Sequence, residues 1–228
     1  AVIDHLWDVI AAKGFESETY FEMAARDIRA LPKLEGTVHV NIALILKFML
    51  NYFTNHADLP EVGRQDEARN DDFLFDQGPT RGLGKIRFHD YERVFARFEQ
   101  PNVGVFREQM AVFRDCMMQA PLDEGQTRDT DFLLAVGEIF TLIVYAQLIL
   151  ENAPVYALGD DEIDQIFDVL VRDFSRFAQQ MHGKTASTPA QMEHCLKMIR
   201  KPVVDLERSD RVWRERVLAL ADAYEMRA

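Results

Sequence analysis

A glutamate followed by a glycine and a threonine, Glu35-Gly36-Thr37, stands just before a long apolar stretch of the sequence. The apolar stretch predicts a helix, whose N-terminus favours a charged carboxylate, whereas burial against an apolar ligand favours the neutral form. A carboxylate between these influences suits proton abstraction near neutral pH. Gly36 has no side chain, so a ligand could approach the backbone closely. The same residues also fit a solvated turn in which Thr37 caps the next helix.

Other candidate chemistry in the sequence is weaker. Gly82-Leu83-Gly84 lies among cations, but a phosphate-binding loop needs a strand before it, and none is expected there. A solvated loop is therefore favoured, with contact to the phosphates of CoA as the alternative. His194-Cys195 has no companion at the spacing of metal ligands, and the six histidines are scattered. The sequence predicts no metal site.

The elements around these residues have helical periodicity almost everywhere. Helices are expected over residues 2–13, 18–31, 38–55, 89–99, 103–119, 130–151, 161–181, 189–200 and 209–226. Gly14 and Pro32 are expected to end the first two. No alternating strand pattern of useful length occurs, so the fold class is predicted to be all-α. Residues 57–87 are rich in glycine, proline and charge, which is typical of a linker, a wrapping segment or a functional loop. This segment separates an N-terminal part, residues 1–56, from a C-terminal part, residues 88–228.

Composition and charge exclude several classes of partner. The chain has 228 residues and a net charge of -12, which opposes binding to nucleic acid and to anionic membranes. The two cysteines make no disulfide framework, so a cytoplasmic location is expected. The apolar stretch of residues 132–150 is nearly long enough to span a bilayer, but Glu138 interrupts it. A core helix of a bundle, and no membrane span, is the prediction.

Residues 11–41 resemble the C-terminal signature of the acyl-CoA dehydrogenase superfamily. Residues at the spacing of that signature, without a gap, are Gly14-Phe15, Glu18, Arg26-Asp27 and Glu35-Gly36-Thr37. The chain departs from the usual pattern at three places. Ala11-Ala12 stands in place of two glycines, Asp8 in place of a glutamine, and Leu34 in place of an aromatic residue.

The resemblance implies that Glu35 is the base that removes the α-proton of an acyl thioester. The β-hydride then passes to FAD, and a trans-2-enoyl thioester is the product. The resemblance places Leu34 and Gly36 next to the substrate. It places Ala12, Lys13 and Gly14 in a loop that approaches the FAD of a neighbouring subunit, and Thr37 and His39 near the flavin after the base. Arg26 and Asp27 are expected to hold the helix in place.

The resemblance also implies the architecture and the partners. The fold would be a helical bundle like the C-terminal domain of that family, followed by a helical extension at residues 88–228. The N-terminal and β-domain part of such an enzyme is missing from this sequence and would be a partner, along with acyl-CoA or another acyl thioester and further copies in a homo-oligomer. Two alternatives stay open: an acyl-CoA oxidase that uses O2, and a non-catalytic helical assembly subunit.

Overall fold

The computed structural model describes residues 2–17, 19–34, 36–59 and 86–221. It is 74% helix. Among the described residues there is no strand, only a single bridge between His56 and Phe88. The predicted all-α class is therefore confirmed. The described chain divides into two units, residues 1–41 with 213–228, called unit 1, and residues 42–212, called unit 2.

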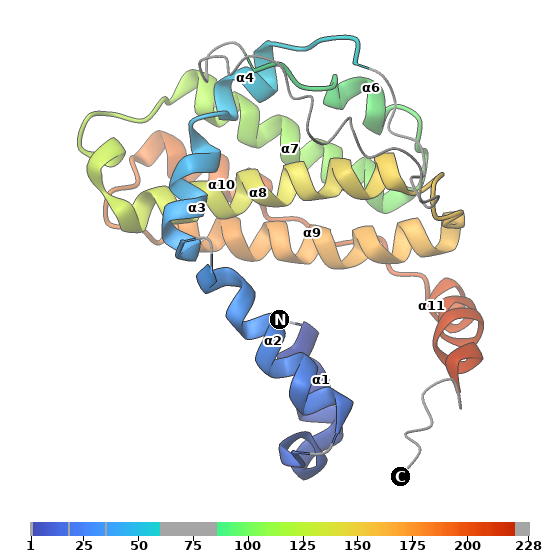
Figure 1. Cartoon of the computed structure of the whole chain (residues 1–228). Coiled ribbons are helices and arrows are strands. Elements are labelled where there is room, and N and C mark those ends of the chain that lie inside the picture. The colour runs from blue at the N-terminus through green and yellow to red at the C-terminus, as the bar shows by residue number, and fades with distance from the viewer. Residues whose placement is uncertain (1, 18, 35, 60–85, 222–228) are drawn as a thin grey trace. The chain divides into compact units, whose positions relative to one another are not determined.

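Unit 1 holds the elements that carry the Glu-Gly-Thr turn (Figure 1). They are α1 (Val2–Ile10), the 3-10 turn η1 (Ala11–Phe15), α2 (Tyr20–Leu34) and the start of α3 (Val38–Leu46). From the other end of the chain come the π-helical turn η4 (Trp213–Val217) and the 3-10 turn η5 (Leu218–Leu220).

The indole of Trp7 is the centre of unit 1. Its ring lies 5.0 Å from that of Phe15 and 5.7 Å from that of Phe21, measured between centroids. The guanidinium of Arg29 lies 4.8 Å from the ring centroid and donates to Asp4 at 2.6 Å. These contacts join α1, η1 and α2 around one aromatic side chain.

Unit 2 is a helical bundle built on α9 (Asp160–His182). It packs against α7 (Pro101–Gln119), α8 (Thr130–Asn152), α10 (Pro189–Met198) and α11 (Leu206–Val212). Figure 1 shows α8, in yellow, running side by side with α9, in orange. The short helices α4 (Met49–Thr54) and α6 (Tyr91–Phe95) complete the unit, with the 3-10 turn η3 (Gln126–Arg128) before α8.

Aromatic rings fill the core of unit 2. The ring of Phe106 stacks on that of Phe95 at 5.9 Å and meets the rings of Phe167 and Phe174 edge-on, each at 5.4 Å. All four side chains are fully buried. Edge-to-face pairs add stabilisation beyond their buried area. The core thus ties α6, α7 and α9 together.

The apolar helix α8 is long and apolar enough to cross a membrane, by length and composition alone, and the other described helices do not reach this level. In the structure 56% of its most apolar window is buried inside the protein. Its buried face includes Phe132, Ile139, Phe140 and Ile143, which belong to the core of unit 2. Nothing here contradicts the predicted absence of a membrane span.

Several expected helix boundaries differ in the structure. The helix predicted at residues 38–55 is broken between α3 and α4, where Lys47 and Phe48 make 3-10-type bonds that tighten the end of α3. α2 continues through Pro32 to Leu34, although a proline inside a helix removes a backbone donor and crowds the carbonyl four residues before it. α6 is only five residues long, and after it the N–H groups of Arg97 and Phe98 make 3-10-type bonds to Val94 and Phe95.

The expected parts, residues 1–56 and 88–228, do not coincide with the two units, because unit 2 begins at residue 42 and unit 1 includes residues 213–228. Tyr52 and Phe53, which the sequence assigns to the N-terminal part, lie in the core of unit 2. The predicted helix at residues 209–226 is described only to residue 221 and consists of α11, η4 and η5. Most of the expected linker, residues 60–85, lies outside the described residues.

Candidate functional site

The turn between α2 and α3 is the first candidate site. Glu35 itself lies outside the described residues, and its role as the base stays a prediction. Gly36 has a φ of +99°, a conformation that a residue with a Cβ rarely adopts. α2 ends at Leu34 and α3 begins at Val38, so the chain turns between two helices at the place where the sequence indicated a turn.

Thr37 caps α3. Its Oγ1 accepts a hydrogen bond from the Val40 N–H at 3.4 Å, and its carbonyl accepts one from the Asn41 N–H at 3.1 Å. The predicted N-cap is therefore confirmed. His39 is exposed, and Leu34 is 71% exposed. The candidate residues around the turn thus lie at the surface of unit 1.

The loop η1 is the second candidate region. Ala11 has a φ of +50°, the left-handed conformation that favours glycine, at a position where the resembled signature usually has one. Ala12 and Lys13 are exposed. Gly14 is buried, and a Cβ there would lie 2.6 Å from Nε1 of Trp7. The structure therefore gives Gly14 a packing role, which is to admit the indole.

These two regions lie at opposite ends of α2. The helix has 15 residues, which at about 1.5 Å per residue separates its ends by roughly 22 Å. Ala12, Lys13 and Gly14 are thus not brought together with Leu34, Gly36, Thr37 and His39. Any cofactor contact from η1 is a separate contact from one made at the turn.

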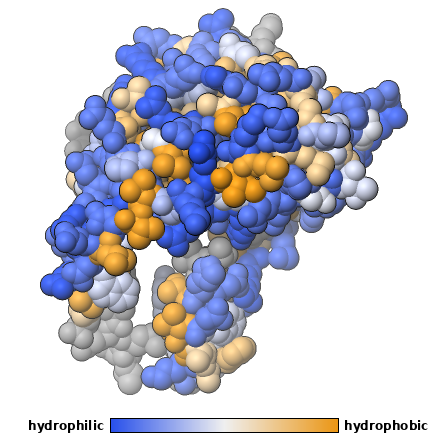
Figure 2. Space-filling view, turned by 180° about the vertical axis from the view of Figure 1, so that it is seen from behind, coloured by the Kyte–Doolittle hydropathy of each residue, from blue (hydrophilic) through white to orange (hydrophobic). Residues whose placement is uncertain are grey.

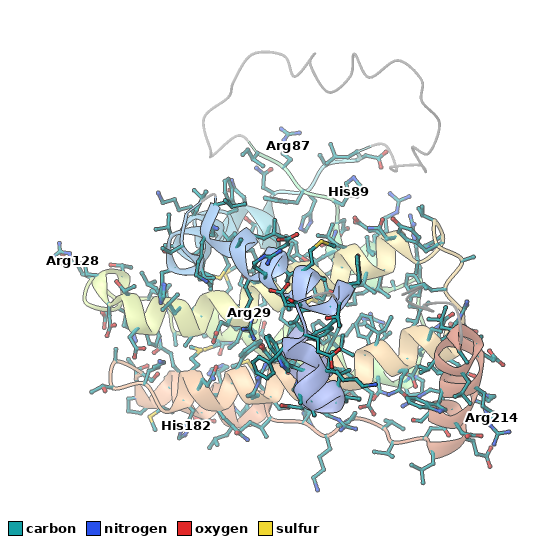
Figure 3. The ribbon with its side chains drawn as sticks, turned by 60° about the horizontal axis from the view of Figure 1, so that its bottom comes forward. Arg29, Arg87, His89, Arg128, His182 and Arg214 are labelled. Atoms are coloured by element: carbon teal, nitrogen blue, oxygen red, sulfur yellow. The ribbon has the colours of Figure 1, made fainter. Side chains whose placement is uncertain are left out.

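A cavity of about 530 Å³ in unit 2 is a site that the sequence did not indicate. Its wall includes His56, His89 and Glu151. Nδ1 of His89 lies 3.1 Å from Oε1 of Glu151, which also accepts a hydrogen bond from Nε2 of Gln147 at 2.8 Å. Figure 3 shows His89 close to Arg87, in the segment that leads into α6. The backbone bridge between His56 and Phe88 places His56 and His89 in the same wall, although more than thirty residues of sequence separate them. No short sequence motif could therefore have indicated this pair.

Buried tyrosine and cysteine side chains are held in their neutral forms. Burial raises the pKa of Tyr52, whose hydroxyl donates to Oε1 of Gln147 at 2.6 Å. Burial also raises the pKa of Cys116 to about 11 and that of Cys195 to about 12. Thiols with such pKa values are poor nucleophiles. Over the residues that the structure describes, no group of three or more His, Cys, Asp or Glu side chains is placed to hold a metal ion.

Comparisons with known proteins add no identification. No family model matches this sequence. Likewise, no curated protein and no solved structure matches it.

Proposed function

We propose that this chain is the C-terminal part of a flavin-dependent acyl-CoA dehydrogenase, with Glu35 as its general base. The observation that carries the proposal is the turn that follows Glu35. Gly36 has a positive φ there, and Thr37 caps α3. This order of helix, Glu-Gly-Thr turn and helix is the one that the resemblance implies. A solvated turn would need Gly36 for its positive φ, but it would not need a glutamate before the glycine or Arg26-Asp27 at the spacing of the signature.

Each residue at the turn has a role in taking the α-proton of an acyl thioester. Glu35 precedes the N-terminus of α3, whose dipole favours the carboxylate that must accept the proton. The absence of a Cβ on Gly36 lets the thioester approach the backbone. Leu34 offers an exposed apolar side chain to the acyl group. Stabilisation of the developing enolate by hydrogen bonds makes the α-proton acidic enough to be taken.

FAD would supply the acceptor for the hydride of the β-carbon, and the residues present fit this cofactor in part. Thr37 and His39 are exposed beside the turn, and Ala12 and Lys13 are exposed in η1. Gly14 does not fit, because Trp7 fills the space over it. Exposed residues at both ends of α2 agree with a loop that would approach the FAD of a neighbouring subunit. That arrangement supports a homo-oligomer.

Apolar side chains on unit 1 support a further protein part as a partner. Along α2 and α3, Leu31 is 63% exposed and Val40 is 60% exposed. Figure 2 shows apolar residues, in orange, in several places on one face of the protein. Contiguous apolar faces mark interaction surfaces, and we propose that unit 1 presents one. The N-terminal and β-domain part of a dehydrogenase would cover these apolar side chains. The enzyme would be located in the cytoplasm. An acyl-CoA oxidase would use the same residues, with O2 as the electron acceptor.

A non-catalytic helical assembly subunit is the second candidate. The packing of Trp7 over Gly14 favours it, because that packing leaves η1 with a structural purpose of its own. The two functions differ in what they require of Glu35. Only the dehydrogenase needs a carboxylate at this position.

The test is Glu35→Gln in the complete assembly purified from its source. Glutamine keeps the size of the side chain but cannot accept the proton, so turnover and exchange of the thioester α-proton for deuterium should fall about 10²–10⁴-fold. Flavin content, measured by visible absorbance, should not change. Glu16→Gln, at an exposed glutamate of the same unit, is the matched control and should keep full activity. An assembly without flavin, or a Glu35→Gln variant with near-normal turnover, would favour the assembly subunit.

A further inference from the structure

The wall of the cavity in unit 2 holds both polar and apolar side chains. His56, His89 and Glu151 are among the polar ones, and they come from the residues after α4, from those before α6 and from the last turn of α8. The apolar ones include Val94, Phe98, Leu148, Pro154 and Val155. A volume of about 530 Å³ is within the range of small-molecule sites. The cavity belongs to unit 2 alone and is independent of the dehydrogenase proposal.

A chain of hydrogen bonds fixes the imidazole of His89. The hydroxyl of Tyr52 donates to Gln147, and Gln147 donates to Glu151, which lies 3.1 Å from Nδ1 of His89. A carboxylate can only accept, so Nδ1 of His89 carries the proton. In the tautomer whose only ring proton is on Nδ1, the lone pair is on Nε2. Among the described residues, Nε2 has no partner. The side chain of His89 is 26% exposed and therefore accessible to a ligand.

His56 has the opposite tautomer. Its Nε2 lies 2.8 Å from the carbonyl oxygen of Tyr52, so this nitrogen donates, and its Nδ1 lies 3.9 Å from Oδ1 of Asp90. Backbone bonds from Ala57 to Phe88, at 3.0 Å, and from Phe88 to Asn55, at 3.3 Å, hold this segment beside the one that carries His89. The two histidines are thus positioned by the backbone as well as by their side-chain partners.

The charged groups of the cavity have partners inside the protein. Arg93 pairs with Asp58 at 3.4 Å, and Asp90 accepts from two N–H groups at the start of α6. The wall holds the cations Arg93 and Arg97 and the carboxylates of Asp58, Asp90 and Glu151, an excess of one negative charge before the histidines are counted. This balance does not favour an anion. The feature left for a ligand is a hydrogen-bond acceptor in a wall that also holds apolar side chains.

We propose that this cavity binds a small neutral molecule with an apolar body and one hydroxyl group, such as an alkylphenol or a medium-chain alcohol. The hydroxyl donates to Nε2 of His89, and the body lies against Val94, Phe98 and Leu148. Glu151 holds the imidazole in the accepting tautomer. A molecule of the same shape without the hydroxyl leaves the imidazole nitrogen buried and without a donor, which weakens binding.

The experiment compares 4-propylphenol with 4-propylanisole, in which a methyl group replaces the hydroxyl proton, by calorimetric titration of the full chain. The phenol should bind on the order of tenfold more tightly than the anisole. His89→Phe keeps an aromatic ring of similar size and should remove that preference. His182→Phe is the control, because His182 lies far from His89 in unit 2 (Figure 3), and it should keep the preference.

Nitrogen-15 NMR of the histidine rings is a second measurement that needs no variant. The free protein should show the Nδ1–H tautomer for His89 and the Nε2–H tautomer for His56, and the phenol should shift the Nε2 resonance of His89. Equal affinities for phenol and anisole, tighter binding of 4-propylbenzoate, the opposite tautomer of His89, or no binding of any of these probes would overturn the proposal. The dehydrogenase proposal is unaffected by these outcomes, because none of them involves Glu35 or flavin.

Discussion

Two glycines inside long helices of unit 2 give opposite predictions for the same substitution. At Gly137 in α8, a Cβ would lie 2.0 Å from Cγ2 of Ile42 in α3. At Gly104 in α7, a Cβ would meet nothing within 4 Å. Alanine is preferred to glycine inside a helix, so the two substitutions differ only in what the new methyl group touches.

The magnitudes follow from this difference. Gly104→Ala should stabilise the protein by about 0.5–1 kcal/mol. Gly137→Ala gains the same term but overpacks the contact with α3, which typically costs about 1–3 kcal/mol. Ile42 cannot easily turn away, because a β-branched side chain in a helix has one strongly preferred rotamer. The two variants should therefore differ by roughly 1–3 kcal/mol, or by about 2–12 °C in melting temperature for a chain of this size.

Urea unfolding followed by far-ultraviolet circular dichroism measures both free energies. Ile42→Ala removes the methyl group that is in the way, so Gly137→Ala should cost less in that background, with a coupling of about 1 kcal/mol. The reasoning would be refuted if Gly137→Ala were as stable as Gly104→Ala. In that case the end of α3 would not pack on α8 as the structure has it.

Three further predictions concern unit 2. Arg208 is buried with two aspartates of α9, so Arg208→Met should cost about 3–5 kcal/mol in urea unfolding, whereas Arg211→Ala, at an exposed ion pair, should cost less than about 1 kcal/mol. Equal costs would contradict the buried network. Cys116 and Cys195, whose pKa values are raised from the usual 9.0, should resist iodoacetamide at pH 8 in the native protein and react after unfolding. Because the unfolded chain loses these protons first, stability should fall as the pH rises above about 9; rapid native labelling would contradict the burial. Finally, residues 38–212 produced alone should unfold cooperatively, since the core lies wholly within them, and a broad, non-cooperative transition would show that the core needs unit 1.

Helical periodicity predicts one apolar stripe along residues 89–99 and a second along residues 103–119. The first consists of Tyr91, Val94, Phe95 and Phe98, and the second of Val105, Met110, Phe113 and Met117. In the structure all of these are buried in the core except Phe98, Val105 and Met117, which are partly buried against it. The same reasoning missed Phe106, which is fully buried and at the centre of the aromatic cluster. The pattern shows a face, but the depth of a residue depends on how close a second helix lies. That distance is set by side chains far away in the sequence.

The turn and the cavity differ in how far the sequence could predict them. The Gly36 turn and the Thr37 cap depend on neighbouring residues, and both were predicted. The site around His89 depends on a backbone bridge between residues 56 and 88 and on a hydrogen-bond chain that reaches Tyr52. None of these partners is local, so no short motif could indicate them.

The exposed side chains of unit 1 also limit what kind of partner can cover them. Complete burial of a leucine, isoleucine or valine side chain gains about 1.5–3 kcal/mol. Leu31, Leu34, Val38 and Val40 are between 50% and 71% exposed, so covering all four gains roughly 3–8 kcal/mol. A separate chain loses about 4–15 kcal/mol of translational and rotational freedom on binding. A separate partner must therefore add many contacts beyond these four side chains, whereas a covering part tethered to this chain needs far fewer, because its local concentration is already high.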